Sequence, residues 1–302
     1  MAALSPMMQQ YFDIKKQHPD KILFFRLGDF YEMFYDDAIL ASKELELTLT
    51  GRDCGQEERA PMCGVPFHSY ENYVARLIAK GYKVAICEQM EDPALAKGLV
   101  KRDIIRVVTP GTVIESSMLQ DDKNNYIASI YITEKKAGVC FADVSTGTAH
   151  ATVLTGEKLG PEIISELCRY SPSEVLFNAA ILDYKEVTAY IKQQLACSVE
   201  LLDEAAFAPD ACMEEMRAQF GDAPEKTAGL APESPAFTAL AVLLGYLKET
   251  QKKGVERLKT VHNYAEAQYM QLSPVTRANL ELTETMRGRE KKGTLLWVLD
   301  KT

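Results

Sequence analysis

A run of four apolar residues at positions 22–25, Ile-Leu-Phe-Phe, is followed by Gly28-Asp29 and then by an aromatic and acidic cluster at positions 30–34. An apolar run of this length that leads into Gly-Asp predicts a buried strand entering a tight turn. Such a turn would hold the first aromatic residue, Phe30, rigidly at a domain surface. Glu32, two residues later, could then accept a hydrogen bond from whatever Phe30 contacts.

The same Phe-x-Glu triplet is also typical of the first turn of an amphipathic helix. From position 31 onward, Phe34, Ala38, Ala41 and Leu45 recur at three- and four-residue spacing. This period predicts a helix that runs from the triplet to about residue 45.

Length and composition indicate a globular protein of about two domains, since the chain has 302 residues, of which 47% are apolar and 25% charged. The longest apolar stretch, residues 237–247, is too short to span a bilayer. Residues 1–10 have no basic segment followed by an apolar one, so the expected location is the cytoplasm. The 7 cysteines and 4 histidines show no metal-ligand spacing, and the cysteines are expected to be reduced.

The order of the predicted elements favours an α/β fold. Ser-Pro pairs at positions 5–6, 234–235 and 273–274 predict helix starts, and Ser69 can cap a helix that Gly81 ends. Apolar runs at 82–87 and 104–108 predict strands, with a polar loop at 51–59. Short strands between 126 and 154 and alternating helices and strands from 161 to 202 predict helices that cover a sheet. A loop at 221–235 and a strand near 269–272 are expected after these.

The charges of the chain do not decide whether it binds nucleic acid. The net charge of −9 argues against such a partner, but Lys97, Lys101, Arg102 and Arg106 lie close together with a single acid, Asp103. Phosphate contacts need a local basic patch and not a basic protein. A solvated charged loop is the alternative interpretation of this segment.

Catalytic motifs are scarce, because the sequence contains no GxxxxGK[ST] phosphate-binding loop. The strongest candidate is Asp143, which precedes a Ser-Thr-Gly turn between two predicted strands. A metal-dependent nuclease of ribonuclease-H-like fold would use such an Asp, but it needs further converging carboxylates. The later strands end in Asn178 and Asp203, a poor match, so a structural role for Asp143 is favoured.

Six segments together resemble the amino-terminal part of the MutS family of bacterial mismatch-recognition proteins. They lie at residues 6–11, 28–34, 64–68, 84–89, 109–112 and 277–281, in the family's order and spacing. The resemblance covers the whole chain. It implies a mixed-sheet mismatch-binding domain at 1–117, a ribonuclease-H-like connector domain at 118–255, and the start of a helical core or lever domain at 256–302. The chain end at residue 302 suggests a piece of a longer protein.

The resemblance also implies roles for particular residues. Phe30 would stack on the mispaired or unpaired base from the minor groove, and Glu32 would hydrogen-bond that base. Arg52 and Arg102 match arginines that contact DNA near the mismatch. Further candidates for contact are Leu27, Lys97, Lys101 and Arg106.

The implied partner is double-stranded DNA that carries a mismatch or a small loop. In the family, the full protein is a homodimer that uses ATP and Mg²⁺ and works with MutL. The segment in hand lacks the ATPase, so we expect no cofactor, no catalysis and a monomeric state for it. Two alternatives remain: a connector-type scaffold for repair partners, and a ribonuclease-H-like metal nuclease.

Overall fold

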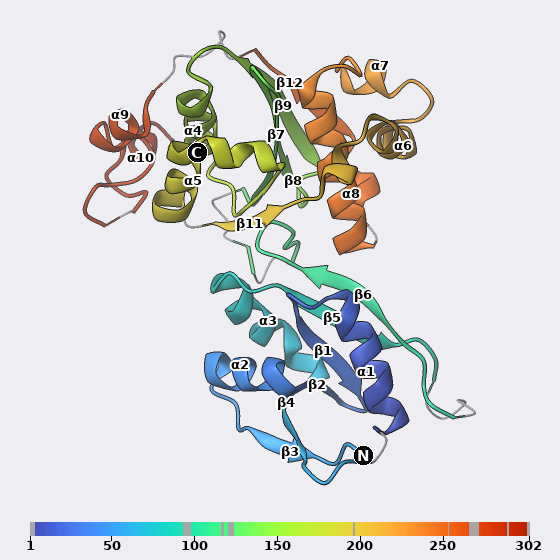
Figure 1. Cartoon of the computed structure of the whole chain (residues 1–302). Coiled ribbons are helices and arrows are strands. Elements are labelled where there is room, and N and C mark those ends of the chain that lie inside the picture. Colours follow the sequence, from blue (N-terminus) through green and yellow to red (C-terminus); the bar gives the residue numbers. More distant parts are fainter. Residues whose placement is uncertain are drawn as a thin grey trace. The chain divides into compact units, whose positions relative to one another are not determined.

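The computed structural model describes residues 4–92, 98–115, 118–119, 124–195, 197–252, 254–265, 272–288 and 290–300. The chain forms two compact units, each built around a six-stranded sheet (Figure 1). Unit 1 comprises residues 1–125, 143–147 and 244–259, and unit 2 comprises 126–142, 148–243 and 260–302. Among the described helices, none has the length and apolar character needed to cross a membrane.

The sheet of unit 1 has the strand order β3-β4-β2-β1-β5-β6. β1 pairs in parallel with β5, and the other neighbouring pairs are antiparallel, so the sheet is mixed. Its strands are β1 (Ile22–Leu27), β2 (Phe30–Phe34), β3 (Thr50–Arg52), β4 (Ala60–Pro66), β5 (Val84–Gln89) and β6 (Arg102–Val108).

Three helices cover this sheet: α1 (Pro6–Gln17), α2 (Tyr35–Leu45) and α3 (Tyr70–Ala79). Alternate residues of β1 bury themselves in two separate cores, because successive strand side chains point to opposite faces. Phe24 packs with α2 and α3 residues, whereas Phe25 packs with Met8 and Tyr11 of α1. The apolar run at 22–25 is therefore a fully buried central strand, as the sequence predicts.

The helix predicted from the Phe-x-Glu triplet is wrong in its first part. Residues Phe30–Phe34 form strand β2, and helix α2 begins only at Tyr35. Aromatic residues suit a strand that is paired on both edges, and β2 lies between β1 and β4. The predicted loop at 51–59 is also too long, because it overlaps β3.

The sheet of unit 2 has the strand order β11-β10-β7-β8-β9-β12. β10 runs parallel to both β7 and β11, and β12 runs parallel to β9. Its strands are β7 (Tyr126–Ile132), β8 (Lys136–Asp143), β9 (Thr148–Thr155), β10 (Glu174–Phe177), β11 (Ser198–Leu201) and β12 (Thr260–Asn263). The predicted α/β fold class is confirmed.

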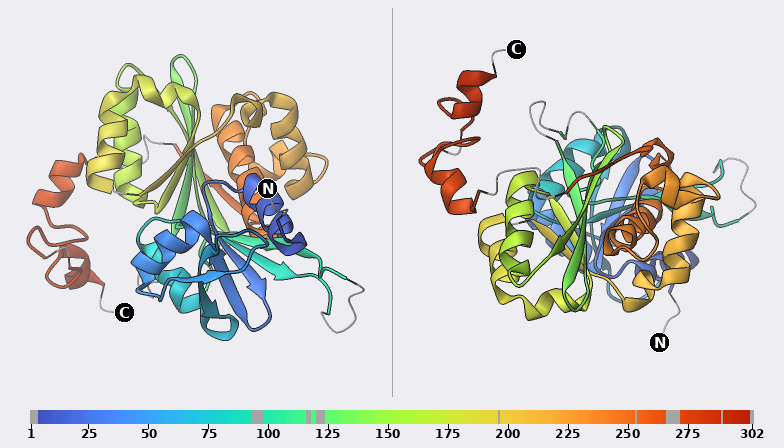
Figure 2. Two further views of the ribbon diagram at one scale, coloured as in Figure 1. Left: turned by 60° about the horizontal axis from the view of Figure 1, so that its bottom comes forward. Right: turned by 90° about the horizontal axis from the view of Figure 1, so that it is seen from above.

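Helices flank both faces of the second sheet (Figure 2). α4 (Leu159–Tyr170) and α5 (Lys185–Tyr190), which continues as a π-helical turn over Ile191–Leu195, cover one face through Ile163, Leu167 and Val187. The other face carries α6 (Pro209–Phe220), α7 (Pro224–Ala228) and the start of α8 (Pro235–Gln251). The remaining elements are short: 3-10 turns at Phe67–Ser69, Ala179–Asp183, Glu204–Phe207 and Val255–Arg257, and helices α9 (Pro274–Asn279) and α10 (Leu295–Leu299).

The predicted Ser-Pro helix starts are confirmed at α1, α8 and α9. The Ser5 and Ser273 hydroxyls accept hydrogen bonds from the backbone N–H groups of Met8 and Thr276. Ser69 differs, since its hydroxyl donates to the Pro66 carbonyl and does not cap α3. The loop predicted at 221–235 contains α7, and most of the strand predicted near 269–272 lies outside the described residues.

Candidate nucleic-acid interface

The turn between β1 and β2 presents Phe30 to solvent. Leu27 pairs with Phe30 across the two strands, which leaves Gly28 and Asp29 as the connection. Gly28 has φ of +56°, a backbone conformation that glycine adopts without the cost imposed by a Cβ atom. The Phe30 side chain begins β2 with 47% of its surface exposed, whereas Tyr31 beside it is buried. The exposed aromatic residue predicted from the sequence is therefore present.

Arg26 braces this turn from one side. Its Nε donates a hydrogen bond of 2.6 Å to the Gly28 carbonyl, and its Nη1 lies 3.0 Å from Glu88 Oε1. The guanidinium carbon also lies 3.7 Å from the centroid of the Phe67 ring. The Phe67 backbone N–H donates to the Asp29 carbonyl at 2.9 Å, which closes the turn from the β4 side. These contacts hold the backbone that carries Phe30 in place.

Glu32 and Arg52, both predicted site residues, form an ion pair through Oε2 and Nη1. They lie on β2 and β3, which pair with opposite edges of β4, so their side chains meet across the intervening strand. The β4 residue opposite Glu32 is Gly64, and a Cβ atom there would lie 3.5 Å from Glu32 Cγ. That distance is an ordinary van der Waals contact, so the pair depends on the strand pairing and not on the absence of a side chain at Gly64.

Arg102 is mostly buried, with 8% of its surface exposed. Its Nε donates to the Arg26 carbonyl at 2.7 Å, and its Nη1 donates to Gln10 Oε1 and the Val100 carbonyl at 3.0 Å each. Burial lowers the pKa of its guanidinium. The structure thus uses Arg102 to join α1, β1 and β6, and its contact with DNA stays a prediction.

The other candidates are dispersed. Leu27 is half-buried at the end of β1, and Lys101 is exposed beside the start of β6. Arg106 forms an ion pair with Glu115, and its Nη2 donates to the Thr112 carbonyl at 3.2 Å. Lys97 lies outside the described residues. The basic segment at 97–106 therefore does not present all its charges on one described surface.

Asp143 organises the turn between β8 and β9. One carboxylate oxygen accepts hydrogen bonds from the Ser145 backbone N–H at 2.9 Å and from the Ser145 hydroxyl at 2.6 Å. The Thr146 backbone N–H donates to the same oxygen at 3.4 Å. Within the described part of the chain, no three His, Cys, Asp or Glu side chains converge as a metal site. These contacts support the structural interpretation of Asp143.

Two known families match consecutive parts of the chain. The family described as MutS domain I matches residues 5–117, which include Phe30, Glu32 and Arg52, and the family described as MutS domain II matches residues 125–261. The chain belongs to the MutS family. The resemblance deduced from the six sequence segments is thereby confirmed.

Curated relatives extend this similarity over the whole chain. A DNA mismatch repair protein MutS from Ruminiclostridium cellulolyticum is 51% identical over 302 residues, which are 100% of this chain and 34% of the relative. The MutS of Acetivibrio thermocellus is 50% identical over 306 residues, with the same two shares, and that of Clostridioides difficile is 45% identical over 313 residues, 100% of this chain and 31% of the relative. The chain spans about a third of the length of these MutS relatives.

In MutS domain I, the turn between β1 and β2 can present an aromatic ring to a partner molecule. The Phe30 ring is exposed there, and the carboxylate of Glu32 is already neutralised by the guanidinium of Arg52. Arg26 and Phe67, which hold the backbone of the turn that carries Phe30, were not identified from the sequence. An arginine two residues before a glycine is too common a pattern to indicate that the arginine side chain holds a turn.

Proposed function

We propose that this chain senses mismatches and small loops in double-stranded DNA for mismatch repair, with Phe30 as the residue inserted into the duplex. The observation that carries this proposal is the exposed Phe30 ring on a turn braced by Arg26 and Phe67. Its position within the MutS domain I match supports it, as does the name of the relatives, DNA mismatch repair protein MutS.

Insertion of an aromatic ring would test how easily the duplex deforms. Apolar wedges between base steps partly unstack them and kink the DNA, at a cost of a few kcal/mol per step. That cost is smallest where a base is already mispaired or unpaired. Discrimination through deformability would serve many different mismatches, whereas one hydrogen bond to a base edge would suit few of them.

Glu32 and Arg52 would exchange partners on DNA. In the free protein each neutralises the other. At a mismatch, Glu32 would accept a hydrogen bond from a base N–H, and Arg52 would turn to a backbone phosphate, which positions the protein without reading sequence. On an intact duplex no displaced base is offered, so a released carboxylate would face phosphates and weaken binding.

This exchange predicts the effect of Glu32→Gln in the full-length protein. The change removes the repulsive charge, so we expect roughly threefold to tenfold tighter binding to a matched duplex, about 1 kcal/mol, and a smaller ratio of mismatched to matched affinity. Fluorescence anisotropy with a G·T duplex and its matched counterpart would measure both. Glu71→Gln, an exposed glutamate on α3, is the matched control. Unchanged affinity for both duplexes would contradict the exchange.

The proposal extends to the whole protein of which this chain would form part. By its family, that protein would be a cytoplasmic homodimer with an ATP- and Mg²⁺-dependent ATPase, and MutL would be a partner that the connector could engage as a scaffold. A wedge in one subunit would then work together with a clamp formed by both. The enzymatic activity would reside outside the two matched domains.

The 302-residue chain by itself is therefore expected to bind DNA weakly. Without a clamp, the wedge must offset the whole cost of kinking the duplex, so the affinities for G·T and matched duplexes should differ by less than about threefold. Anisotropy at low salt would measure this, since phosphate contacts weaken as salt rises. Tight and selective binding by the chain alone would show that the clamp is unnecessary.

A further inference from the structure

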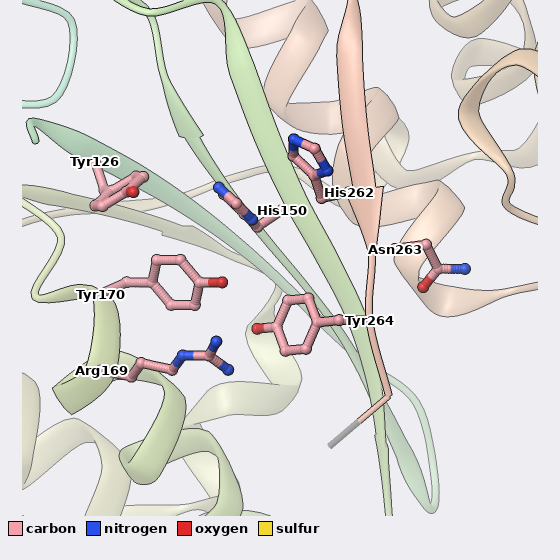
Figure 3. A pocket seen from close by; sticks show the side chains of 7 residues that line it. All are labelled: Tyr126, His150, Arg169, Tyr170, His262, Asn263 and Tyr264. Carbon is pink, nitrogen blue, oxygen red and sulfur yellow. The ribbon is translucent and has the colours of Figure 1, made fainter. Parts of the chain in front are cut away.

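Unit 2 contains a pocket of about 490 Å³ that the mismatch-sensing proposal does not use (Figure 3). It lies where the end of α4 approaches the edge of the sheet formed by β9 and β12. Drug-sized ligands occupy pockets of about 300 to 1,000 Å³, so the pocket has the size of a ligand site. Its walls combine aromatic rings with nitrogen atoms that can donate hydrogen bonds.

Two imidazoles form one wall. His150 and His262 are direct neighbours on the parallel strands β9 and β12, and their ring centroids lie 5.1 Å apart at an interplanar angle of 25°. Among the residues that the structure describes, neither ring engages in a hydrogen bond. Burial, followed by the proximity of His262 and Arg169, lowers the pKa of His150. A neutral imidazole offers one N–H donor, so this wall can receive an acceptor atom.

A guanidinium enters the pocket from α4. The Arg169 guanidinium carbon lies 5.2 Å from the Tyr170 ring centroid and 5.0 Å from that of Tyr264, so two rings position it. Glu166 is an acidic group beside it, with its Oε2 at 3.9 Å from Arg169 Nη1. Tyr264 donates a hydrogen bond to the same Glu166 oxygen. The pocket is therefore lined by a guanidinium that two tyrosine rings orient.

The tyrosine rings are fixed in orientation. Tyr170 stacks on buried Phe141, with centroids 4.0 Å apart and an angle of 14°, and Tyr126 meets Tyr170 edge-on at 5.1 Å. Figure 3 shows the Tyr170 and Tyr264 side chains and Arg169 directed into one space, with His150 on its far side. Flat apolar faces and anion-binding nitrogens thus border the same cavity.

We propose that this pocket binds a nucleoside monophosphate. The base would stack against the tyrosine rings, since stacking of a base on an aromatic side chain is favourable for every base. The phosphate would accept hydrogen bonds from Arg169 and from an imidazole N–H, and guanidinium–phosphate bonds are among the strong charge-assisted ones. A divalent cation fits poorly, because Arg169 repels it and the described chain offers no third ligand there.

Isothermal titration calorimetry of the 302-residue chain tests this with adenosine 5′-monophosphate as the probe. We expect saturable 1:1 binding, and at least tenfold weaker binding for adenosine or inorganic phosphate alone. Arg169→Gln should weaken binding at least tenfold. The matched control is Arg217→Gln on α6, an exposed arginine outside the pocket, which should leave it unchanged.

His262→Gln provides a second variant, because that exposed side chain can change without disturbing the core. We expect it to weaken adenosine 5′-monophosphate binding roughly threefold to tenfold, and circular dichroism would verify that each variant is folded. The assignment is overturned by the absence of saturation at millimolar nucleotide, by equal affinities in the Arg169 and Arg217 variants, or by phosphate alone binding as tightly as the nucleotide. None of these outcomes bears on Phe30, so the mismatch-sensing proposal is tested separately.

Discussion

Replacing Phe30 by alanine in the full-length protein should reduce the ratio of G·T to matched-duplex affinity to about one. The wedge ring supplies the stacking that distinguishes a deformable step, and loss of base–aromatic stacking costs about 1 to 3 kcal/mol, or roughly fivefold to 150-fold in affinity. The fold should be unaffected, since 47% of Phe30 is exposed and the turn is held by Arg26 and Gly28. Fluorescence anisotropy on paired duplexes measures the ratio directly.

The control for Phe30→Ala is Ile39→Ala. Ile39 is an apolar residue of α2 that is 51% exposed and lies in the same unit, so its truncation removes comparable surface away from the turn. It should leave the affinity ratio unchanged. Retention of full selectivity by the Phe30 variant would remove the basis of the proposed function. A loss of selectivity in both variants would point to a general effect on the unit.

The strands of unit 1 show which elements could be predicted from the sequence and which could not. The run at 22–25 was predictable because a central strand with packed cores on both faces of the sheet carries apolar residues on both sides. β2 was missed in favour of a helix, because its aromatic residues suit either structure and only pairing with β1 and β4 decides. β4 carries proline at two positions and a central glycine, so its sequence gives no strand signal before its partners are known.

The candidate site, too, could be predicted only in part. The resemblance identified Phe30, Glu32 and Arg52 individually, but their arrangement depends on long-range pairing. Glu32 meets Arg52 only because β2 and β3 pair with opposite edges of β4. The pocket of unit 2 could not be predicted from the sequence, since Arg169, His150 and His262 come from three separate elements, one helix and two strands. No local spacing connects them.

Gly138→Ala should destabilise unit 2 more than any other alanine substitution at its glycines with negative φ. A Cβ atom at this β8 position would lie 1.9 Å from the Pro235 carbonyl oxygen and 2.3 Å from the Ala236 nitrogen, both backbone atoms at the start of α8. Backbone cannot rotate away as a side chain can, so the helix must shift from the sheet and lose packing along its length. Overpacking of this kind costs about 3 kcal/mol or more.

Urea unfolding followed by circular dichroism measures the effect of Gly138→Ala as a lowered midpoint. Gly288→Ala is the matched control, because its Cβ would meet only flexible side chains, the nearest atom being Glu290 Cγ at 3.4 Å. Each substitution restricts the unfolded chain alike, by about 0.4 to 1 kcal/mol, so the difference between the variants isolates the clash. Equal midpoints would mean that α8 does not approach β8 as closely as its backbone positions require. A much lower midpoint for Gly138→Ala would show that close helix–sheet contact fixes this part of the connector.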